Sequence, residues 1–458
     1  MRQVWFVAQG KTPFRWRSSF RRHFSGEQSL YRRGIHPSPP AKPAWLTDLS
    51  LGLKESYDDN VFLSGVDSSD LPASYTVPPG SVAALKDHSS WVTTVSPKIG
   101  VNFAPLFGDQ KQLPVLSLAY APDFAIYHQE RSEDYSAHRL ATFIKGKWDS
   151  VSFTAENNFA YVDGNQFAPF YPGALTSAYA TAAVRERREQ IQDRSAVTLQ
   201  FDQTNWFIRF TASLLYYDLQ TEQVNIPGYQ NYADRYDVNG GGDLGFKFSP
   251  RLAVTMGYRY GHQYQEQYAF SPYSSPSDYH RVLVGFEGRP WNWLEFKLQA
   301  GPDFRHYPGD TLTHVTPLDD KNPVKYYGEA SLTATFTPRD TLTFRYKQWQ
   351  WLSSTGRIPY YDSVFDLCYR RKLTRQLTMD LGGRILSSDY TEGNLPACQR
   401  NDWQYTVSAG LAYAINAHTS FNLAYALDLG RNALDSVINP ETREYHRNVI
   451  SLGVLLKF

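Results

Sequence analysis

The chain has 458 residues, with 46 Lys and Arg against 45 Asp and Glu, so its formal net charge is only +1 and no nucleic-acid partner is indicated. Hydrophobic residues make up 42% of the chain, and its mean hydropathy is −0.48. No run approaches the roughly 18 to 20 apolar residues of a spanning helix, which excludes a helical membrane protein. Aromatic residues reach 15%, a level that favours strands and aromatic belts at membrane interfaces.

Residues 1–47 differ from the rest of the chain. Their apolar patch, Val4 to Ala8, is shorter than the roughly 7 to 15 residues of a secretory signal, and no small-residue cleavage site follows it. The stretch HPSPPAKPAW then has the composition of a Pro-rich linker. We predict a disordered or mispredicted N-terminal segment over residues 1–47, and a protein that is not exported is the alternative.

From residue 48 to residue 458 one unit recurs, in which two alternating runs are joined by a tight turn and followed by a longer polar loop. Between Trp403 and Ile415, every second residue is apolar or aromatic, and the residues between them are Gln, Thr, Ser, Gly or Ala. Leu252 to Tyr260 and Phe421 to Leu429 alternate in the same way. Strict alternation predicts strands whose two faces meet different media.

Tight turns rich in Pro, Asn and Asp recur at intervals of roughly 40 to 50 residues, so each repeat is one hairpin and one long loop. They are predicted at 149–150, 203–205, 249–251, 290–292, 338–340, 374–376 and 416–418, with a less regular turn near 108–112. The fold class is therefore all-β: a transmembrane antiparallel β-barrel of about 18 strands over residues 48–458, with short periplasmic turns and long extracellular loops. A β-propeller is the alternative, but its blades hold four short strands per repeat rather than two long ones.

Prolines make the second and third strands the least regular of the set. Pro97, Pro114 and Pro122 fall in these runs, and a proline cannot donate a hydrogen bond to its neighbour.

The final run, NVISLGVLLKF, alternates from Ile450 to the terminal Phe458. A terminal aromatic residue after alternating hydrophobic residues resembles the signal that the outer-membrane assembly machinery reads. We therefore predict Phe458 as an assembly signal, the assembly machinery and outer-membrane lipid as partners, and the bacterial outer membrane as the location.

Two segments resemble a known family. LGLKESYDDNVFLS at residues 51–64 resembles the opening strand of the β-barrel porin-2 type of outer-membrane proteins, and TMGYRYGHQYQEQ at residues 255–267 is similar to its mid-barrel strands. The resemblance implies a channel, in some cases linked to export of an exopolysaccharide.

No motif in the chain predicts an enzyme or a cofactor. The 11 His are scattered, and neither a nucleophile elbow, H-E-x-x-H nor a Gly-rich phosphate loop is present. Asp58, Asp59 and Asn60 offer oxygen ligands for Ca²⁺ but lack further ligands, so a strand-end cluster that bonds to backbone is preferred and no metal site is predicted. Cys368 in mid-strand and Cys398 in a loop are expected to be free thiols, with a disulfide as the alternative.

Charged residues on the face opposite the apolar one are predicted to line the lumen, because Arg or Lys facing lipid at mid-plane costs about 2 to 4 kcal/mol. The basic members outnumber the acidic ones, which predicts a weakly positive, water-filled lumen. The basic residues are Arg259, Arg281, Arg289, Lys297, Arg305, Arg345, Lys347, Arg370, Lys372 and Arg384, and the acidic ones are Glu287, Glu295, Asp303, Glu329, Asp366 and Asp380.

The loop from Gln166 to Arg188 is unusually apolar and is predicted either to fold into the lumen and narrow it or to pack on neighbouring surface loops. Tyr-rich loops such as YAFSPYSSPSDY are suited to stacking on sugars or to an aromatic girdle. The predicted function is a porin-like channel for passive passage of small solutes, including small anionic ones, or of a saccharide polymer. The alternative is a non-conducting barrel that acts as an adhesin or a structural anchor.

Overall fold

The structure is a computed structural model that describes residues 43–70, 76, 82–107, 111–166, 187–220, 232–266, 276–308, 321–352, 354, 359–389, 400–434 and 444–458. Cys398, the turn at 108–110 and most of the Gln166 to Arg188 loop (167–186) lie outside the described residues. Short 3-10 helices occur at Ser68–Asp70, Ala104–Phe107 and Arg131–Glu133. Among the described residues, no helix is long and apolar enough to cross a membrane.

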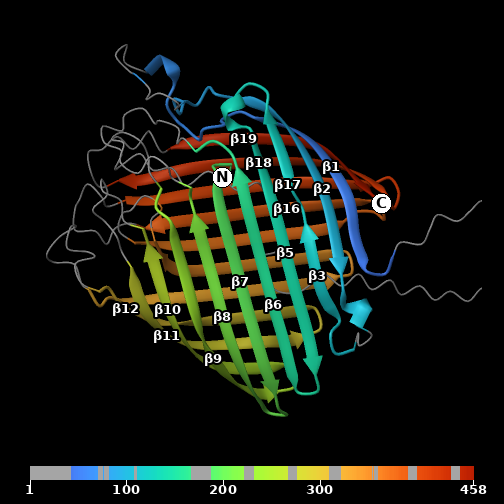
Figure 1. Ribbon diagram of the computed structural model, residues 1–458, viewed down its shortest axis with the longest axis vertical. Helices are drawn as coiled ribbons and strands as arrows, with labels where there is room; N and C mark the ends of the chain where they lie inside the picture. The colour runs from blue at the N-terminus through green and yellow to red at the C-terminus, as the bar shows by residue number, and fades with distance from the viewer. Residues whose placement is uncertain are drawn as a thin grey trace, which may run out of the picture.

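All strands belong to one antiparallel sheet (Figure 1). They are β1 (Leu46–Asp58), β2 (Ser90–Asn102), β3 (Val115–Tyr120), β4 (Asp123–Tyr127), β5 (Tyr135–Trp148), β6 (Val151–Asp163), β7 (Gln190–Asp202), β8 (Trp206–Asp218), β9 (Arg235–Ser249), β10 (Leu252–Gln265), β11 (Ser277–Trp291), β12 (Leu294–His306), β13 (Val324–Thr337), β14 (Asp340–Trp351), β15 (Tyr360–Lys372), β16 (Leu377–Asp389), β17 (Arg400–Ala414), β18 (Thr419–Leu434) and β19 (Tyr445–Lys457).

The sheet closes on itself, because β1 pairs with β2 on one side and with β19 on the other. β3 and β4 both lie between β2 and β5, so the 19 strands fill 18 positions of the wall. The predicted barrel of about 18 strands is confirmed. The interruption between β3 and β4 falls at Ala121 and Pro122, where proline has no N–H to give to a ladder. In Figure 1 the strands β5 to β8 cross in front of the strands of the opposite wall.

Tight turns join the strands at one end of the barrel. They occupy 149–150, 203–205, 250–251, 292–293, 338–339, 373–376 and 415–418, within one or two residues of the predicted positions. Asn416 shows why such residues are used, since its side-chain oxygen accepts the backbone N–H groups of His418 and Thr419 at 2.7 and 2.8 Å. The start of β1 and the C-terminus lie at the same end, where Phe458 N–H donates to Leu49 O at 2.8 Å.

Side chains at the end of β1 and just after it, Asp58 to Asn60, form hydrogen bonds across the seam between β1 and β19. Arg447 of β19 donates two hydrogen bonds to Asp58, at 2.8 and 2.6 Å, and one to Asp428 of β18 at 3.1 Å. Asp59 accepts the backbone N–H and the side-chain amide of Asn448, at 2.6 and 2.7 Å. The side-chain amide of Asn60 donates to His446 O at 2.9 Å. Asp58, Asp59 and Asn60 thus join the first strand to the last through bonds to side chains and backbone groups of β19.

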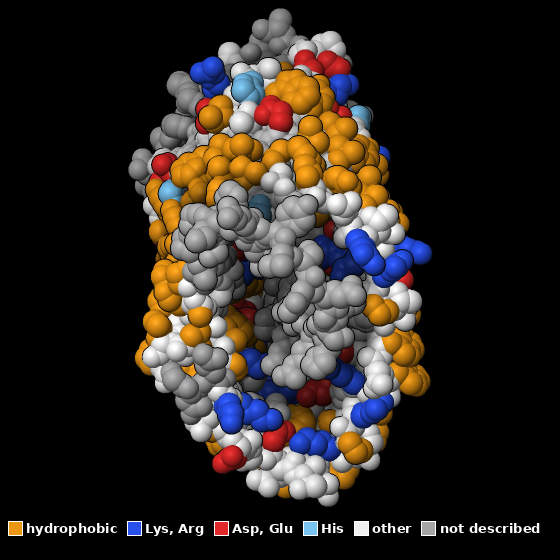
Figure 2. Space-filling model, turned by 90° about the vertical axis from the view of Figure 1, so that its right-hand side faces the viewer, with side chains coloured by type: hydrophobic (Ala, Val, Ile, Leu, Met, Phe, Trp, Pro, Cys, Tyr) orange, Lys and Arg blue, Asp and Glu red, His pale blue; other side chains and the backbone are white. Residues whose placement is uncertain are grey.

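Hydrophobic side chains cover the outside of the wall. Figure 2 shows them along both flanks, while charged side chains gather around the hollowed end that faces the viewer. Aromatic rings stack near the tight turns, with Trp293 lying 5.4 Å from Trp291 and 5.6 Å from Phe336 between ring centroids. An apolar exterior with interfacial aromatics and a closed hydrogen-bonded wall is the architecture of a bacterial outer-membrane β-barrel.

Candidate functional site

The candidate site is the interior of the barrel, which strand alternation separates from the lipid-facing surface. On β10, Met256, Tyr258 and Tyr260 are 64%, 46% and 48% exposed on the outside. The intervening Thr255 and Arg259 are buried on the opposite face. Because lipid cannot solvate a guanidinium group, this alternation directs charged side chains inward.

One group of interior charges spans four strands. Arg209 of β8 bonds to Asp243 of β9 at 2.9 Å and reaches past β10 to Glu287 of β11 with two hydrogen bonds of 3.0 and 2.9 Å. Asp243 also receives Arg259 of β10 at 2.7 Å. The group holds two cations and two carboxylates, so its charges cancel and its paired geometry makes each group's burial tolerable.

A second group lies toward the opposite end of the same wall. Asp303 of β12 receives Arg281 of β11 at 2.7 Å and Arg305 of its own strand at 3.2 Å. Arg281 also lies over the rings of Tyr279 and Tyr327, 4.7 and 3.9 Å from their centroids. Aromatic faces stabilise a desolvated guanidinium group, which explains how two arginines share one carboxylate.

Polar side chains extend this group across β9 and β10. The side-chain oxygen of Gln263 accepts a hydrogen bond from Arg305 at 2.7 Å, and its side-chain nitrogen donates one to Asp237 at 2.6 Å. The Tyr279 hydroxyl donates to the other oxygen of Asp237 at 2.9 Å. Tyr279, Gln263 and Asp303 are at most 1% exposed, so this part of the interior is packed rather than open to water.

The end of β14 separates from β13, stays paired with β15 and turns into the interior. Its pairing with β13 extends only to Gln348, whereas its pairing with β15 continues to Trp351. Gln350, Trp351 and Leu352 are 3%, 5% and 0% exposed. Gln350 donates to the Tyr307 hydroxyl just after β12, and the other partners lie on β8 to β10, which the wall separates from β14 by three further strands. These contacts therefore cross the interior of the barrel.

Hydrogen bonds and ring contacts hold the inturned end in place. The Gln263 amide donates to Gln350 O at 3.2 Å, the Arg235 guanidinium donates to Leu352 O, and Ala233 N–H donates to Ser354 O at 2.6 Å. The Trp351 ring lies 5.1 Å from the Arg235 guanidinium carbon and 6.3 Å from the Tyr217 ring. Sequence reasoning missed this constriction, because Trp349 to Leu352 resembles an ordinary strand end.

Of the remaining charged residues of the predicted set, most form ion pairs or hydrogen bonds, and two form no ion pair among the described residues. Arg289 pairs with Glu295 near the tight turns, Arg370 bonds to Asp380 at 2.6 Å, and Arg384 lies 3.7 Å from Asp366. Glu329 accepts the Tyr327 hydroxyl at 2.7 Å, and Lys297 and Lys372 also have partners. Among the described residues, neither Arg345 nor Lys347 lies within ion-pair distance of a carboxylate. The Lys347 ammonium lies 4.5 Å from the Trp349 ring centroid, and the carboxylate of Glu329, its register partner on β13, is the charged group that acts on it most strongly, ahead of Arg281, Asp237 and Arg194.

Several interior charges were missing from the predicted set. Asp58, Asp243, Asp428 and Arg447 are buried and Arg209 is largely buried, and all five lie on strands outside the predicted β10 to β16 region. Alternation could have found Asp428 and Arg447, which lie opposite the apolar residues of β18 and β19. On β9 the run Asn239-Gly240-Gly241-Gly242 conceals the alternation that points Asp243 inward.

The described end of the Gln166 to Arg188 loop is anchored rather than exposed. The Arg187 guanidinium forms a buried ion pair with Glu133 and donates to Val61 O at 2.7 Å. Val61 belongs to a small apolar cluster with Phe62, Val92 and Tyr127. Within the described part of the chain, no group of three His, Cys, Asp or Glu is placed to hold a metal ion.

No family model and no curated protein match the chain. Among solved structures, OccAB3 of Acinetobacter baumannii is similar at 11% identity and a TM-score of 0.40, over 90% of this chain and 99% of that one. OpdK of Pseudomonas aeruginosa, solved with vanillate, is similar at 11% identity and a TM-score of 0.41, over 91% and 100%. The siderophore receptor PirA of Acinetobacter baumannii is similar at 8% identity and a TM-score of 0.39, over 90% of this chain and 81% of that one. Identities this low assign neither a solute nor a family to the chain.

Proposed function

We propose that the protein is a porin-like channel that passes small solutes, or a saccharide polymer, through the polar interior of the barrel without chemistry. The observation that carries the proposal is the arrangement of charge, with guanidinium, carboxylate and amide groups on the inner face of a closed wall and apolar side chains on the outer face. A barrel that served only as an anchor would gain nothing from so polar an interior, since a packed apolar core is at least as stable.

In this proposal the sixteen charged residues predicted from β10 to β16 line the lumen, and the inturned end of β14 is its narrow part. The tight turns and both ends of the barrel domain face the periplasm, and the longer connections face outward. Membership of the β-barrel porin-2 type is likewise a proposal, supported by residues 51–64 and 255–267.

Arg345 and Lys347 are the residues through which the lumen selects among ions. Ion-paired charges present little net field to a passing solute, whereas unpaired cations near a constriction attract anions over about 10 Å at 0.1 M salt. We therefore expect a modest preference for anions. The wide part of the lumen contributes little, because water and salt screen its charges.

Planar-bilayer recording of the purified protein tests the proposal. We expect discrete conductance steps, and a reversal potential under a KCl gradient that indicates anion preference. Arg345→Glu with Lys347→Glu should shift the reversal potential toward cation preference. The control is Arg371→Gln, which removes an exposed charge at the tight-turn end and should leave selectivity unchanged.

Absence of any conductance would reject the channel and leave the non-conducting anchor. Conductance with no shift in the double variant would retain a channel but reject the assignment of Arg345 and Lys347 to its lumen.

A further inference from the structure

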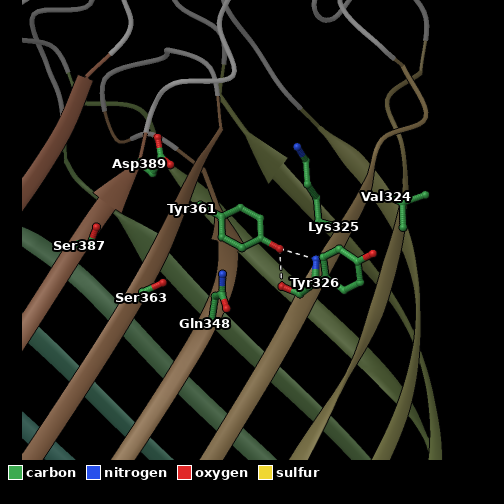
Figure 3. Close-up of a pocket in the computed structure, with 8 residues that line it drawn as sticks. All are labelled: Val324, Lys325, Tyr326, Gln348, Tyr361, Ser363, Ser387 and Asp389. Atoms are coloured by element: carbon green, nitrogen blue, oxygen red, sulfur yellow. Dashed lines mark hydrogen bonds between the residues drawn. The ribbon is translucent and has the colours of Figure 1, made fainter. Parts of the chain in front are cut away.

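A cavity of about 340 Å³ opens in the wall where β14 departs from β13 (Figure 3). Its volume falls at the lower end of the range of small-ligand pockets, about 300 to 1,000 Å³. The lining residues come from four consecutive strands and are Val324, Lys325, Tyr326, Gln348, Tyr361, Ser363, Ser387 and Asp389.

Tyr361 explains why the wall stays intact at this gap. In a regular barrel the N–H and C=O groups of Tyr326 would pair with position 350 of β14, but Gln350 turns inward. The Tyr361 hydroxyl, from β15, accepts the Tyr326 N–H at 2.5 Å and donates to Tyr326 O. In Figure 3 its ring points across the gap toward β13. One side chain thus satisfies two backbone groups that lipid could not.

The cavity lies on the lipid-facing side of the barrel, beyond the apolar band. Strand alternation places Tyr361 and Ser363 on the same face as Phe365 and Leu367, which are exposed hydrophobic residues. On β16, Ser387 and Asp389 continue the face of Leu381 and Ile385. β15 and β16 therefore change from apolar to polar on their outer faces as they approach the connections opposite the tight turns.

The polar side chains that line the cavity have hydrogen-bonding groups that can bind a ligand. The Gln348 side-chain oxygen accepts the Tyr346 hydroxyl at 2.7 Å, and its amide donors have no partner among the described residues. The Ser387 hydroxyl donates to Asn401 at 3.1 Å and keeps its acceptor lone pairs. Tyr326 is 67% exposed, so its ring offers a flat surface beside these groups.

An exposed aromatic ring beside amide, hydroxyl and carboxylate groups is suited to a sugar, which has apolar C–H faces and a rim of hydroxyl groups. We propose that this cavity binds the saccharide head group of a glycolipid in the outer leaflet. The location decides between a lipid and a free sugar, since the cavity opens sideways at the edge of the apolar band, where acyl chains reach Phe365 and Leu367. The proposal rests on the outward orientation of this end given above, but not on conduction.

The test measures lipid retention by the purified barrel. Wild type is reconstituted in phosphatidylcholine vesicles with or without lipopolysaccharide, extracted into mild detergent, and analysed by native mass spectrometry. Tyr326→Ala is the variant, and Phe336→Ala is its matched control, because Phe336 is an exposed aromatic at the tight-turn end of the same strand. The second variant, Gln348→Ala with Ser363→Ala, leaves the Tyr361 bridge in place. A shift in gel mobility on boiling verifies that every variant has folded.

We expect wild type and Phe336→Ala to retain lipopolysaccharide, and both cavity variants to retain at least fivefold less. Deacylated saccharide should compete weakly, because it lacks the acyl chains. Equal retention by folded cavity variants and Phe336→Ala would overturn the proposal. Equal retention of phosphatidylglycerol in parallel vesicles, or competition by deacylated saccharide as strong as by the glycolipid, would overturn the assignment to a glycolipid.

Discussion

Replacing Arg447 should weaken the seam that closes the barrel. The side chains of Arg447, Asp58 and Asp428 are only 10%, 3% and 7% exposed. Arg447→Met removes three hydrogen bonds and leaves two buried carboxylates facing each other. Removing one partner of a buried ion pair costs about 3 to 5 kcal/mol. The lower end, about 3 kcal/mol, applies here because Asp58 keeps the Asn60 N–H at 3.2 Å and Asp428 keeps the Thr406 hydroxyl at 2.6 Å.

The measurement is urea unfolding of the barrel in lipid vesicles, followed by tryptophan fluorescence and by gel mobility without boiling. Arg370→Met is the matched control, because its ion pair with Asp380 is half exposed and such pairs contribute about 0 to 1 kcal/mol. Combining Arg447→Met with Asp58→Leu and Asp428→Leu should recover most of the loss, since no charge is then left unpaired. If Arg447→Met destabilises the barrel no more than Arg370→Met, the seam does not depend on this ion pair.

Three further predictions follow from single residues. Phe458→Ser should reduce outer-membrane assembly without reducing synthesis, and normal surface exposure of the variant would reject the terminal signal. Trp351→Ala should raise single-channel conductance relative to Trp291→Ala, which alters only the outside; equal conductance would show that the inturned end does not limit flow. Burial, together with Asp218 and Glu266, raises the pKa of Asp234 to about 6, so unfolding free energy should fall as pH rises from about 4 to 6. Asp234→Asn should abolish that slope and stabilise the barrel above pH 6 by about 1 kcal/mol, and an unchanged slope would contradict the assignment.

The class of fold follows from local pattern, and for that reason it could be predicted. Alternation is a property of a single strand, and tight turns such as 149–150 can be recognised from their residue types alone. Closure is less local, yet an even number of strands that each leave an apolar face outward has few other solutions in a membrane. The interruption at Pro122 was also foreseeable, because proline acts on its own ladder position.

The interior contacts depend on which strands face one another across the barrel, and no single strand contains that information. Arg209 and Glu287 are 78 residues apart in sequence, and Gln263 and Gln350 are 87 apart. Alternation can say that Arg209 points inward, but not that it meets Glu287. The departure of β14 from β13 is hidden for the same reason, since the contacts that draw Trp351 inward come from β8 and β9.

These contacts change what the excess of basic residues means for transport. Ten basic against six acidic residues on β10 to β16 suggest a positive lumen, but Arg259 pairs with Asp243 of β9, and Glu287 pairs with Arg209 of β8. Charges held in such groups cancel over a few ångströms, well within the screening length of physiological salt. In the proposed channel, the field that a solute meets then depends on Arg345 and Lys347, which form no ion pair among the described residues, with Glu329 opposite Lys347 and Arg194 nearby. In the channel proposed above, selectivity is therefore a property of one short stretch of the lumen, which is why two substitutions on β14 should change its sign while a variant at the tight-turn rim should not.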